Sequence, residues 1–351
     1  MRRHISLRAA LAALTTTIAA AAGLAAGSPG AAPAGAATGT PLPPHVFAPY
    51  VETYDTASSP STLAQESGAK YLSFAFLQTA SAGSCTAYWN GDTSTPIAPS
   101  SFGSDISAIQ AAGGNAVPSF GGYGADSSGT DIADSCTSVS QIAAAYEAVI
   151  TTYNVPRIDL DIESNSLTNT AGINRRNEAV AQVEKWAKQN GRSIQFSYTM
   201  PGTTTGLDSS ETSVLQNAKA DGARVSVVNV MTFDYYLGTK QNMLADTKTA
   251  AQDTVSQLKS IYPSRSTSAL WHMIGITEMP GIDDYGPDET FTKAEAAPLL
   301  SWAQGQKIST LSFWALQRDN GGCPGTKGSG TCSGLTQPTW YFSHKFEPFT
   351  G

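Results

Sequence analysis

Eight short runs with the composition of β-strands recur at long and fairly even intervals in this chain. They begin at residues 45, 70, 115, 157, 193, 224, 272 and 310, and helical patterns occupy 142–152, 173–189, 250–262 and 293–305. The last helix is expected to start after Thr292, with Glu295 at capping-box spacing. Eight strands alternating with helices predict a single-domain α/β fold, a (β/α)8 TIM barrel. A doubly wound sheet is the alternative, although no glycine-rich phosphate turn follows an early strand.

The first 38 residues have the pattern of an export signal. Three arginines lie at or before residue 8, and an apolar, alanine-rich run follows from Ala9 to Ala26. We therefore expect residues 1–38 to be a signal peptide with a short Ala-, Gly- and Pro-rich leader, and residues 45–351 to be one domain. A transmembrane anchor is a weaker alternative, because the run is mostly Ala, Thr and Gly. The mature protein is predicted to be secreted and extracellular, by either the general or the twin-arginine route.

The charge balance argues against two classes of partner. The chain has 21 basic and 28 acidic residues, a net charge of −7, and its first 44 residues contain three arginines and no acid. The remainder is therefore more acidic still, which disfavours nucleic acid and anionic membrane surfaces as partners. Nothing in the sequence indicates oligomerisation, so a monomer is expected.

The four cysteines agree with export. An even number in an exported chain favours disulfides, and we expect the pairs Cys85–Cys136 and Cys323–Cys332. A metal site is the alternative, but no two cysteines have the close spacing of zinc ligands and the histidines are scattered. No metal is expected.

The fourth run, residues 157–163, carries acidic residues at alternate positions. Asp159, Asp161 and Glu163 share one face of this strand, while the apolar residues between them share the other. The apolar face must pack against helices, so the carboxyl groups are expected to point into the barrel, towards the end where barrel enzymes place their sites. Successive groups lie about 7 Å apart, which should raise the pKa of at least one, as a general acid requires. A solvated face or a set of ion pairs is the alternative.

With these residues the chain resembles glycoside hydrolase family 18, the chitinase family. The run DLDIE at 159–163 matches the family's Asp-x-Asp-x-Glu on the fourth strand. Three further motifs follow in the right strands and order: Ser119-Phe120-Gly121-Gly122 is similar to Ser-x-Gly-Gly, Met231-Thr232-Phe233-Asp234 to Met-x-Tyr-Asp, and Trp314 to the tryptophan that floors the sugar site. The resemblance spans the whole mature chain.

The resemblance implies a secreted chitinase that cleaves β-1,4-linked N-acetylglucosamine in chitin and chito-oligosaccharides. It implies a retaining, substrate-assisted reaction without cofactor, in which Glu163 is general acid and base, Asp161 orients the acetamido group, and Asp159 shares charge or a proton with Asp161. The substrate-binding residues expected from it are Tyr50, Ser119, Gly121, Gly122, Tyr198, Met200, Met231, Asp234, Tyr235 and Trp314. Tyr88, Trp89 and Tyr123 are weaker candidates for stacking on sugars.

Two departures from the family pattern bear on the site. Pro156-Arg157 stands where the family often has Asp-Gly, and a structural variation is expected there. Phe233 stands where the family has a tyrosine whose hydroxyl helps to hold the acetamido carbonyl. Tyr235 or Tyr198 could replace that hydroxyl, and the sequence does not choose between them.

The interval between the last two runs favours endo-type cleavage. Thr277 and Thr310 are too close to accommodate the extra domain that family members with deep tunnels carry there. No appended carbohydrate-binding domain is expected either, so soluble or amorphous chitin should be hydrolysed faster than crystalline chitin. Two alternatives remain, an endo-β-N-acetylglucosaminidase that cleaves N-glycans and a non-catalytic chitin-binding lectin on the same barrel.

Overall fold

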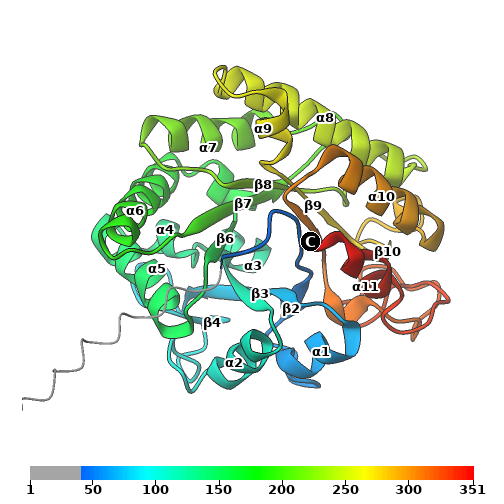
Figure 1. Cartoon of the computed structure of the whole chain (residues 1–351), viewed down its shortest axis with the longest axis horizontal. Coiled ribbons are helices and arrows are strands. Elements are labelled where there is room, and N and C mark those ends of the chain that lie inside the picture. The colour runs from blue at the N-terminus through cyan, green and yellow to red at the C-terminus, as the bar shows by residue number, and fades with distance from the viewer. Residues whose placement is uncertain (1–40) are drawn as a thin grey trace, which may run out of the picture. The chain divides into compact units, whose positions relative to one another are not determined.

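A ring of helices surrounds a cylinder of parallel strands in the computed structural model, which describes residues 41–351 (Figure 1). Each strand of the cylinder pairs in parallel with its neighbours. In chain order they are β1 Val46–Phe47 with β2 Tyr50–Glu52, β3 Tyr71–Thr79, β5 Asn115–Gly121, β6 Arg157–Asp161, β7 Gln195–Pro201, β8 Val227–Met231, β9 Ile274–Glu278 and β12 Thr310–Phe313. All eight predicted runs form these strands.

The sheet closes through its first strand. β1 and β2 are successive segments of that strand: β1 pairs with β12, and β2 pairs with β3. The two edges of the sheet are therefore joined, and the predicted (β/α)8 barrel is confirmed.

The four predicted helical segments are present, each somewhat longer than the pattern indicated. They are α5 Val139–Tyr153, α6 Thr170–Gln189, α8 Met243–Ile261 and α10 Lys293–Gln306. At the start of α10, the Thr292 amide donates to the Glu295 carboxylate at 2.7 Å, as the capping box requires. The other helices of the described chain are α1 Pro60–Ser67, α2 Gly103–Ala111, α3 Tyr123–Ser128, α4 Ile132–Ser135, α7 Ser209–Ala220, α9 Thr267–Trp271 and α11 Tyr341–Phe346.

Short elements extend the barrel beyond its strands. β4 (Ala87–Trp89) pairs antiparallel with β3, and β10 (Gly281–Ile282) forms a hairpin with β11 (Thr290–Phe291) directly after β9. Three 3-10 turns, η1 Ser164–Leu167, η2 Leu316–Arg318 and η3 Glu347–Phe349, complete the elements of the described residues. The sequence patterns predicted none of these pieces.

The two faces of β6 are arranged as its alternation predicted. Ile158 and Leu160 belong to the large apolar cluster that also contains Val180 and Val183 of α6. The acidic side chains of the same strand therefore point to the inside of the barrel.

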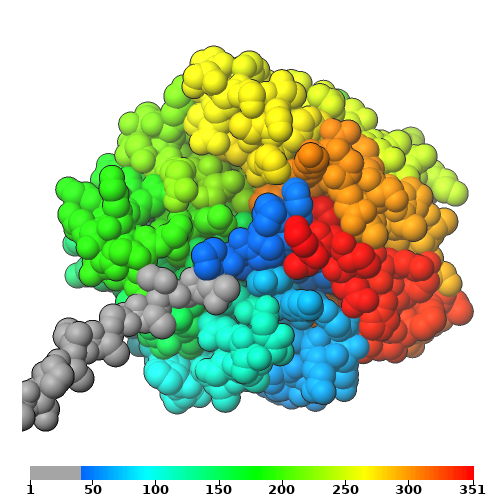
Figure 2. All heavy atoms as spheres, in the orientation of Figure 1, coloured from blue at the N-terminus to red at the C-terminus, as the bar shows by residue number. Residues whose placement is uncertain are grey.

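Both ends of the described chain cover the N-terminal end of the barrel. In Figure 2 the blue segment that follows residue 40 lies beside the red C-terminal segment in the middle of one face. The Phe47 amide donates to Thr350 Oγ1 at 2.9 Å, and the Gly351 amide donates to the His45 carbonyl at 3.3 Å. These contacts join the two ends of the domain beneath the strands.

Both predicted disulfides are present. Cys85–Cys136 joins the loop between β3 and β4 to the end of α4, and Cys323–Cys332 closes the loop after η2. The predicted signal peptide, residues 1–38, lies outside the described residues. In residues 41–351, none of the helices combines the length and the hydropathy that a membrane span needs.

Candidate active site

A cleft of about 960 Å³ lies at the C-terminal ends of the strands. This is the end of the barrel where the residues that follow each strand converge. The predicted site residues that line it are Tyr50, Gly121, Asp161, Glu163, Met231, Asp234 and Trp314. Seven positions that are far apart in the sequence thus meet in one cavity.

Asp159 lies beneath the cleft, surrounded by hydroxyl groups. Its side chain belongs to a residue with only 2% of its surface exposed. Four hydroxyls of β2, β5 and β7 donate to its two oxygens, namely those of Tyr50 (2.8 Å), Ser119 (2.7 Å), Ser197 (2.6 Å) and Thr199 (2.8 Å). Four donated hydrogen bonds fill the acceptor positions of an ionised carboxylate. These hydrogen bonds hold Asp159 in a fixed position below Asp161.

Asp161 is the next residue on the same face, and it has an unused acceptor. Its Oδ1 is buried and has no hydrogen-bond partner in the described part of the chain. Burial, reinforced by the nearby carboxyl groups of Glu163 and Asp159, raises the pKa of Asp161 well above its usual range. A buried oxygen without a partner is costly, so this atom is suited to accept a hydrogen bond from a bound molecule.

Glu163 completes the row of carboxyl groups where β6 ends. It precedes η1, and its side chain lines the cleft. Burial raises the pKa of Glu163 to about 7, while a hydrogen bond from the Tyr123 backbone acts in the opposite direction. A carboxyl group that is partly protonated at neutral pH can donate a proton to a substrate and take one back.

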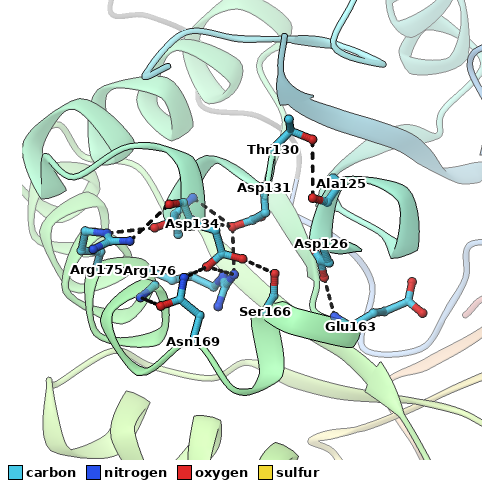
Figure 3. Close-up of polar contacts among 12 residues, drawn as sticks. Ala125, Asp126, Thr130, Asp131, Asp134, Glu163, Ser166, Asn169, Arg175 and Arg176 are labelled. Carbon is cyan, nitrogen blue, oxygen red and sulfur yellow. Dashed lines mark hydrogen bonds and ion pairs between the residues drawn. The ribbon is translucent and has the colours of Figure 1, made fainter. Parts of the chain in front are cut away.

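A buried carboxyl group behind the cleft fixes the backbone at Glu163 (Figure 3). Asp126 of α3 is fully buried, and its Oδ2 accepts the Glu163 amide at 2.5 Å. Burial, together with the nearby Asp131, raises the pKa of Asp126 to about 9. The contact anchors the first residue of the turn that carries the Glu163 side chain.

Arg176 of α6 lies beside the same turn and supports it through Asp131 and Asp134 (Figure 3). Its guanidinium pairs with Asp131 at 2.8 Å and lies 4.0 Å from Asp134. Asp134 in turn accepts hydrogen bonds from Ser166, in η1, and from Asn169. The sequence contained one signal for this network, an arginine in the predicted helix 173–189 on the same face as buried apolar residues.

Gly121 and Gly122 allow the close approach that their motif suggested. Both have positive φ, +98° and +85°. A Cβ atom on Gly121 would lie 2.1 Å from the Asp161 carbonyl oxygen, and one on Gly122 would lie 2.7 Å from the Phe76 ring. Any side chain at either position would displace the backbone of β6 or an aromatic wall of the cleft.

Aromatic rings form the floor and the rim of the cleft. Trp314 stacks on Phe76 with ring centroids 5.5 Å apart and lies 5.8 Å from Tyr50. Tyr54, Tyr123 and Tyr236 line the cleft with more than half of their surfaces exposed, at 53%, 68% and 62%. Such exposed rings suit the apolar faces of sugars. Tyr123 was a candidate from the sequence, whereas Tyr54, Phe76 and Tyr236 were not.

Asp234 is held in a strained position by the β10–β11 hairpin region. Its φ is +53°, and its Oδ1 accepts the backbone amides of Asp284 (2.9 Å) and Tyr285 (3.2 Å). Burial, with the charges of Asp283 and Asp284, raises the pKa of Asp234 to about 7. The side chain is therefore a fixed polar group on the cleft wall.

Two predicted substrate-binding residues point away from the cleft. Tyr198 and Met200 alternate along β7 with the inward-facing Ser197 and Thr199, so they face the helices, and both belong to the apolar core. The Tyr198 hydroxyl donates to Asn177 of α6 at 2.8 Å. Placing these two residues at the substrate was wrong for this reason.

Five other candidates do not line the cleft, namely Ser119, Gly122, Tyr235, Tyr88 and Trp89. Ser119 holds Asp159, as described above. Tyr235 is largely buried, and its hydroxyl has no partner among the described residues, but it does not line the cleft. Trp89 is fully buried and donates to the Tyr153 hydroxyl at 2.9 Å, so it is a core residue whose ring cannot stack on a sugar. Phe233 lines the cleft without a hydroxyl, and neither proposed replacement supplies one there.

Comparison with known proteins agrees with this geometry. Residues 46–279 match the family model described as glycosyl hydrolases family 18. A probable bifunctional chitinase/lysozyme of Escherichia coli is 33% identical over 327 residues, which cover 89% of this chain and 36% of that protein. Endochitinase 11 of Metarhizium anisopliae is 32% identical over 295 residues, covering 80% of this chain and 54% of that protein. The chain thus spans only part of each relative.

Among solved structures, active domain 2 of a chitinase from Pyrococcus furiosus is similar over nearly its full length. It is 30% identical with a TM-score of 0.77, and the match covers 89% of this chain and 97% of that one. Mutants of the same domain have been crystallised with chito-oligosaccharides, and that structure superposes with a TM-score of 0.78.

Proposed function

This chain belongs to glycosyl hydrolase family 18, and we propose that it hydrolyses the β-1,4 linkages of chitin and chito-oligosaccharides. One observation carries the proposal. Asp161 and Glu163 lie together on the wall of one cleft, both with a raised pKa, and a buried oxygen of Asp161 has no partner among residues 41–351. A substrate that brings its own N–H group to that oxygen and its leaving oxygen to Glu163 would use both features.

The proposed reaction proceeds in two steps. Glu163 protonates the glycosidic oxygen. At the same time the acetamido oxygen of the sugar on the non-leaving side of the bond attacks the anomeric carbon of that sugar, so the glycosidic bond breaks and an oxazolinium ion forms. Asp161 accepts the acetamido N–H and stabilises the positive charge, with the charge of Asp159 beneath it. Glu163, now a carboxylate, then takes a proton from water, which opens the ring with overall retention.

The walls of the cleft suit a sugar chain. The Trp314 ring would support the sugar that reacts, and Asp234 would polarise its acetamido group. In the interval between β9 and β12, the described chain has only the β10–β11 hairpin and helix α10. This supports endo-type cleavage. We also propose that soluble or amorphous chitin is hydrolysed faster than crystalline chitin.

The proposed setting is extracellular. Residues 1–38 would direct export, and two disulfides in the domain are typical of exported proteins. We further propose that the enzyme acts as a monomer without a cofactor.

Product analysis tests the proposed function. The protein should convert chitohexaose to a mixture of shorter oligomers and should release soluble oligomers from colloidal chitin faster than from crystalline chitin. Release of glycan from a high-mannose glycoprotein, without cleavage of chitohexaose, would assign it instead as an endo-β-N-acetylglucosaminidase. Binding of chitin without any cleavage would make it a lectin.

The pH dependence of kcat/KM should follow the protonation state of Glu163. Because burial raises the pKa of this general acid to about 7, the fraction that can donate a proton declines as the pH rises through that value. We therefore expect kcat/KM for chitohexaose to fall about ten-fold for each pH unit above the pKa. Initial rates measured from about pH 5 to about pH 9 check this. A profile that stays flat, or that rises through neutral pH, would show that Glu163 is not the acid.

A further inference from the structure

A second hollow, of about 360 Å³, adjoins the cleft on the side of the loop closed by Cys323–Cys332. The two cavities share four lining residues, Tyr54, Met279, Asp284 and Trp314. Asp161 and Glu163 line the cleft but not the hollow. A chain of sugars held at the carboxyl groups can therefore continue over Trp314 into this hollow.

Three acidic residues, Glu52, Asp55 and Asp284, line the hollow. Glu52 is 4% exposed, and among residues 41–351 the only donor to its side chain is the Tyr54 hydroxyl, which lies 2.8 Å from Oε1. Its Oε2 has no hydrogen-bond partner in the described part of the chain, although the residue is buried at the wall of a cavity. A carboxyl group of a buried residue that lines a hollow, with one oxygen that receives no donor, can accept a hydrogen bond from a ligand.

The acidic groups are not neutralised by ion pairs. None of the three lies within 4.0 Å of a basic group among residues 41–351. Two cations, Arg318 and Lys327, are nearby, and the hydrogen bonds that they donate go to backbone carbonyls. Arg318 donates to the carbonyls of Ser329, Pro280 and Ile282 beneath the loop, and Lys327 donates to the Tyr285 carbonyl. The acceptors of the hollow therefore remain available to a ligand.

We propose that this hollow is a subsite for glucosamine, the deacetylated sugar whose C2 ammonium is positively charged. The inference rests on the proposed function and specifies its substrate as partially deacetylated chitin. An ammonium group supplies three donors to the free oxygens of Glu52, Asp55 and Asp284. The face of Tyr54 would hold the sugar ring and add cation–π attraction.

The position of the hollow allows one chain to carry both an acetylated sugar at the reacting centre and a deacetylated sugar in the hollow. The sugar that reacts must keep its acetamido group, because the acetamido oxygen is the nucleophile. A sugar over the hollow lies beyond that centre and does not react, so it can be deacetylated. The enzyme would therefore select a chain with an acetylated sugar at Glu163 and a glucosamine further along.

Binding measurements that do not depend on turnover test this inference. In a Glu163→Gln background, calorimetry would compare chitohexaose with partially deacetylated hexamers, with and without the pair Glu52→Gln and Asp55→Asn. Both substitutions keep the size of the side chain. Asp288→Asn is the matched control, because Asp288 is an exposed acid of the neighbouring hairpin that lines neither cavity.

The double substitution should weaken the binding of partially deacetylated hexamers about ten-fold, the loss of a charge-assisted contact, and leave chitohexaose unchanged. High salt should reduce the difference, and Asp288→Asn should affect neither ligand. Equal weakening of both ligands, or of neither, would overturn the inference. Cleavage of chitohexaose by the unsubstituted protein decides the proposed function separately, so the two can fail independently.

Discussion

Glu163→Gln is expected to lower kcat for chitohexaose by about 10²- to 10⁴-fold, the usual contribution of a general acid and base. Glutamine has nearly the same shape but cannot give a proton to the glycosidic oxygen or take one from water. The backbone contact between Glu163 and Asp126 involves no side-chain atom of Glu163, so the turn should keep its position. KM should therefore change little, and steady-state kinetics would measure both constants.

The control for this variant is Glu178→Gln, which removes an exposed acid from the outer surface of α6. It should retain full activity and the same thermal stability. If Glu163→Gln kept more than about a tenth of the original kcat, Glu163 would not carry the proton transfer.

Asp161→Asn is the second large prediction, with an expected loss in kcat of about 10²- to 10³-fold. The substitution replaces an oxygen that faces the reacting group with an amide, and it removes the carboxyl group that would share negative charge with Asp159 to stabilise the oxazolinium ion. Because the charge of Glu163 raises the pKa of Asp161, the two carboxyl groups titrate as a coupled pair, and removing one of them should also shift the pH at which kcat/KM falls. The full pH dependence of kcat/KM measures both effects.

A purely structural defect at Asp161 would not move the pH profile. Asp288→Asn serves again as the control, because it removes one charge outside the cleft. An Asp161→Asn variant with reduced activity and an unshifted profile would contradict the electrostatic part of the account.

The barrel and the acidic strand could be predicted because both follow from local periodicity. The alternation of Asp159 and Asp161 with Ile158 and Leu160 determines which side of β6 is apolar, and the helices must cover that side. The same rule applied to β7 would have excluded Tyr198 and Met200, since Ser197 and Thr199 are the polar set of that strand. The resemblance to the family suggested those two residues, but the alternation of side chains along β7 places them on the side that faces the helices.

The rest of the site depends on contacts between distant segments. Tyr54 and Tyr236 lie in loops after their strands, and a loop has no regular periodicity from which the direction of a side chain could be predicted. The support of Glu163 by Asp126, and of its turn by Asp134 and Arg176, joins α3, α4 and α6 in three dimensions. Only the folded arrangement identifies these residues as partners of the acid.

The stereochemistry of cleavage tests the central claim most directly. We would add the protein to chitohexaose and follow the anomeric protons of the first products by proton NMR, before mutarotation mixes the anomers. Attack by the acetamido group followed by water gives retention, so the β-anomer of shorter oligomers should appear first. Appearance of the α-anomer first, or hexamer that is bound but never cleaved, would contradict the account.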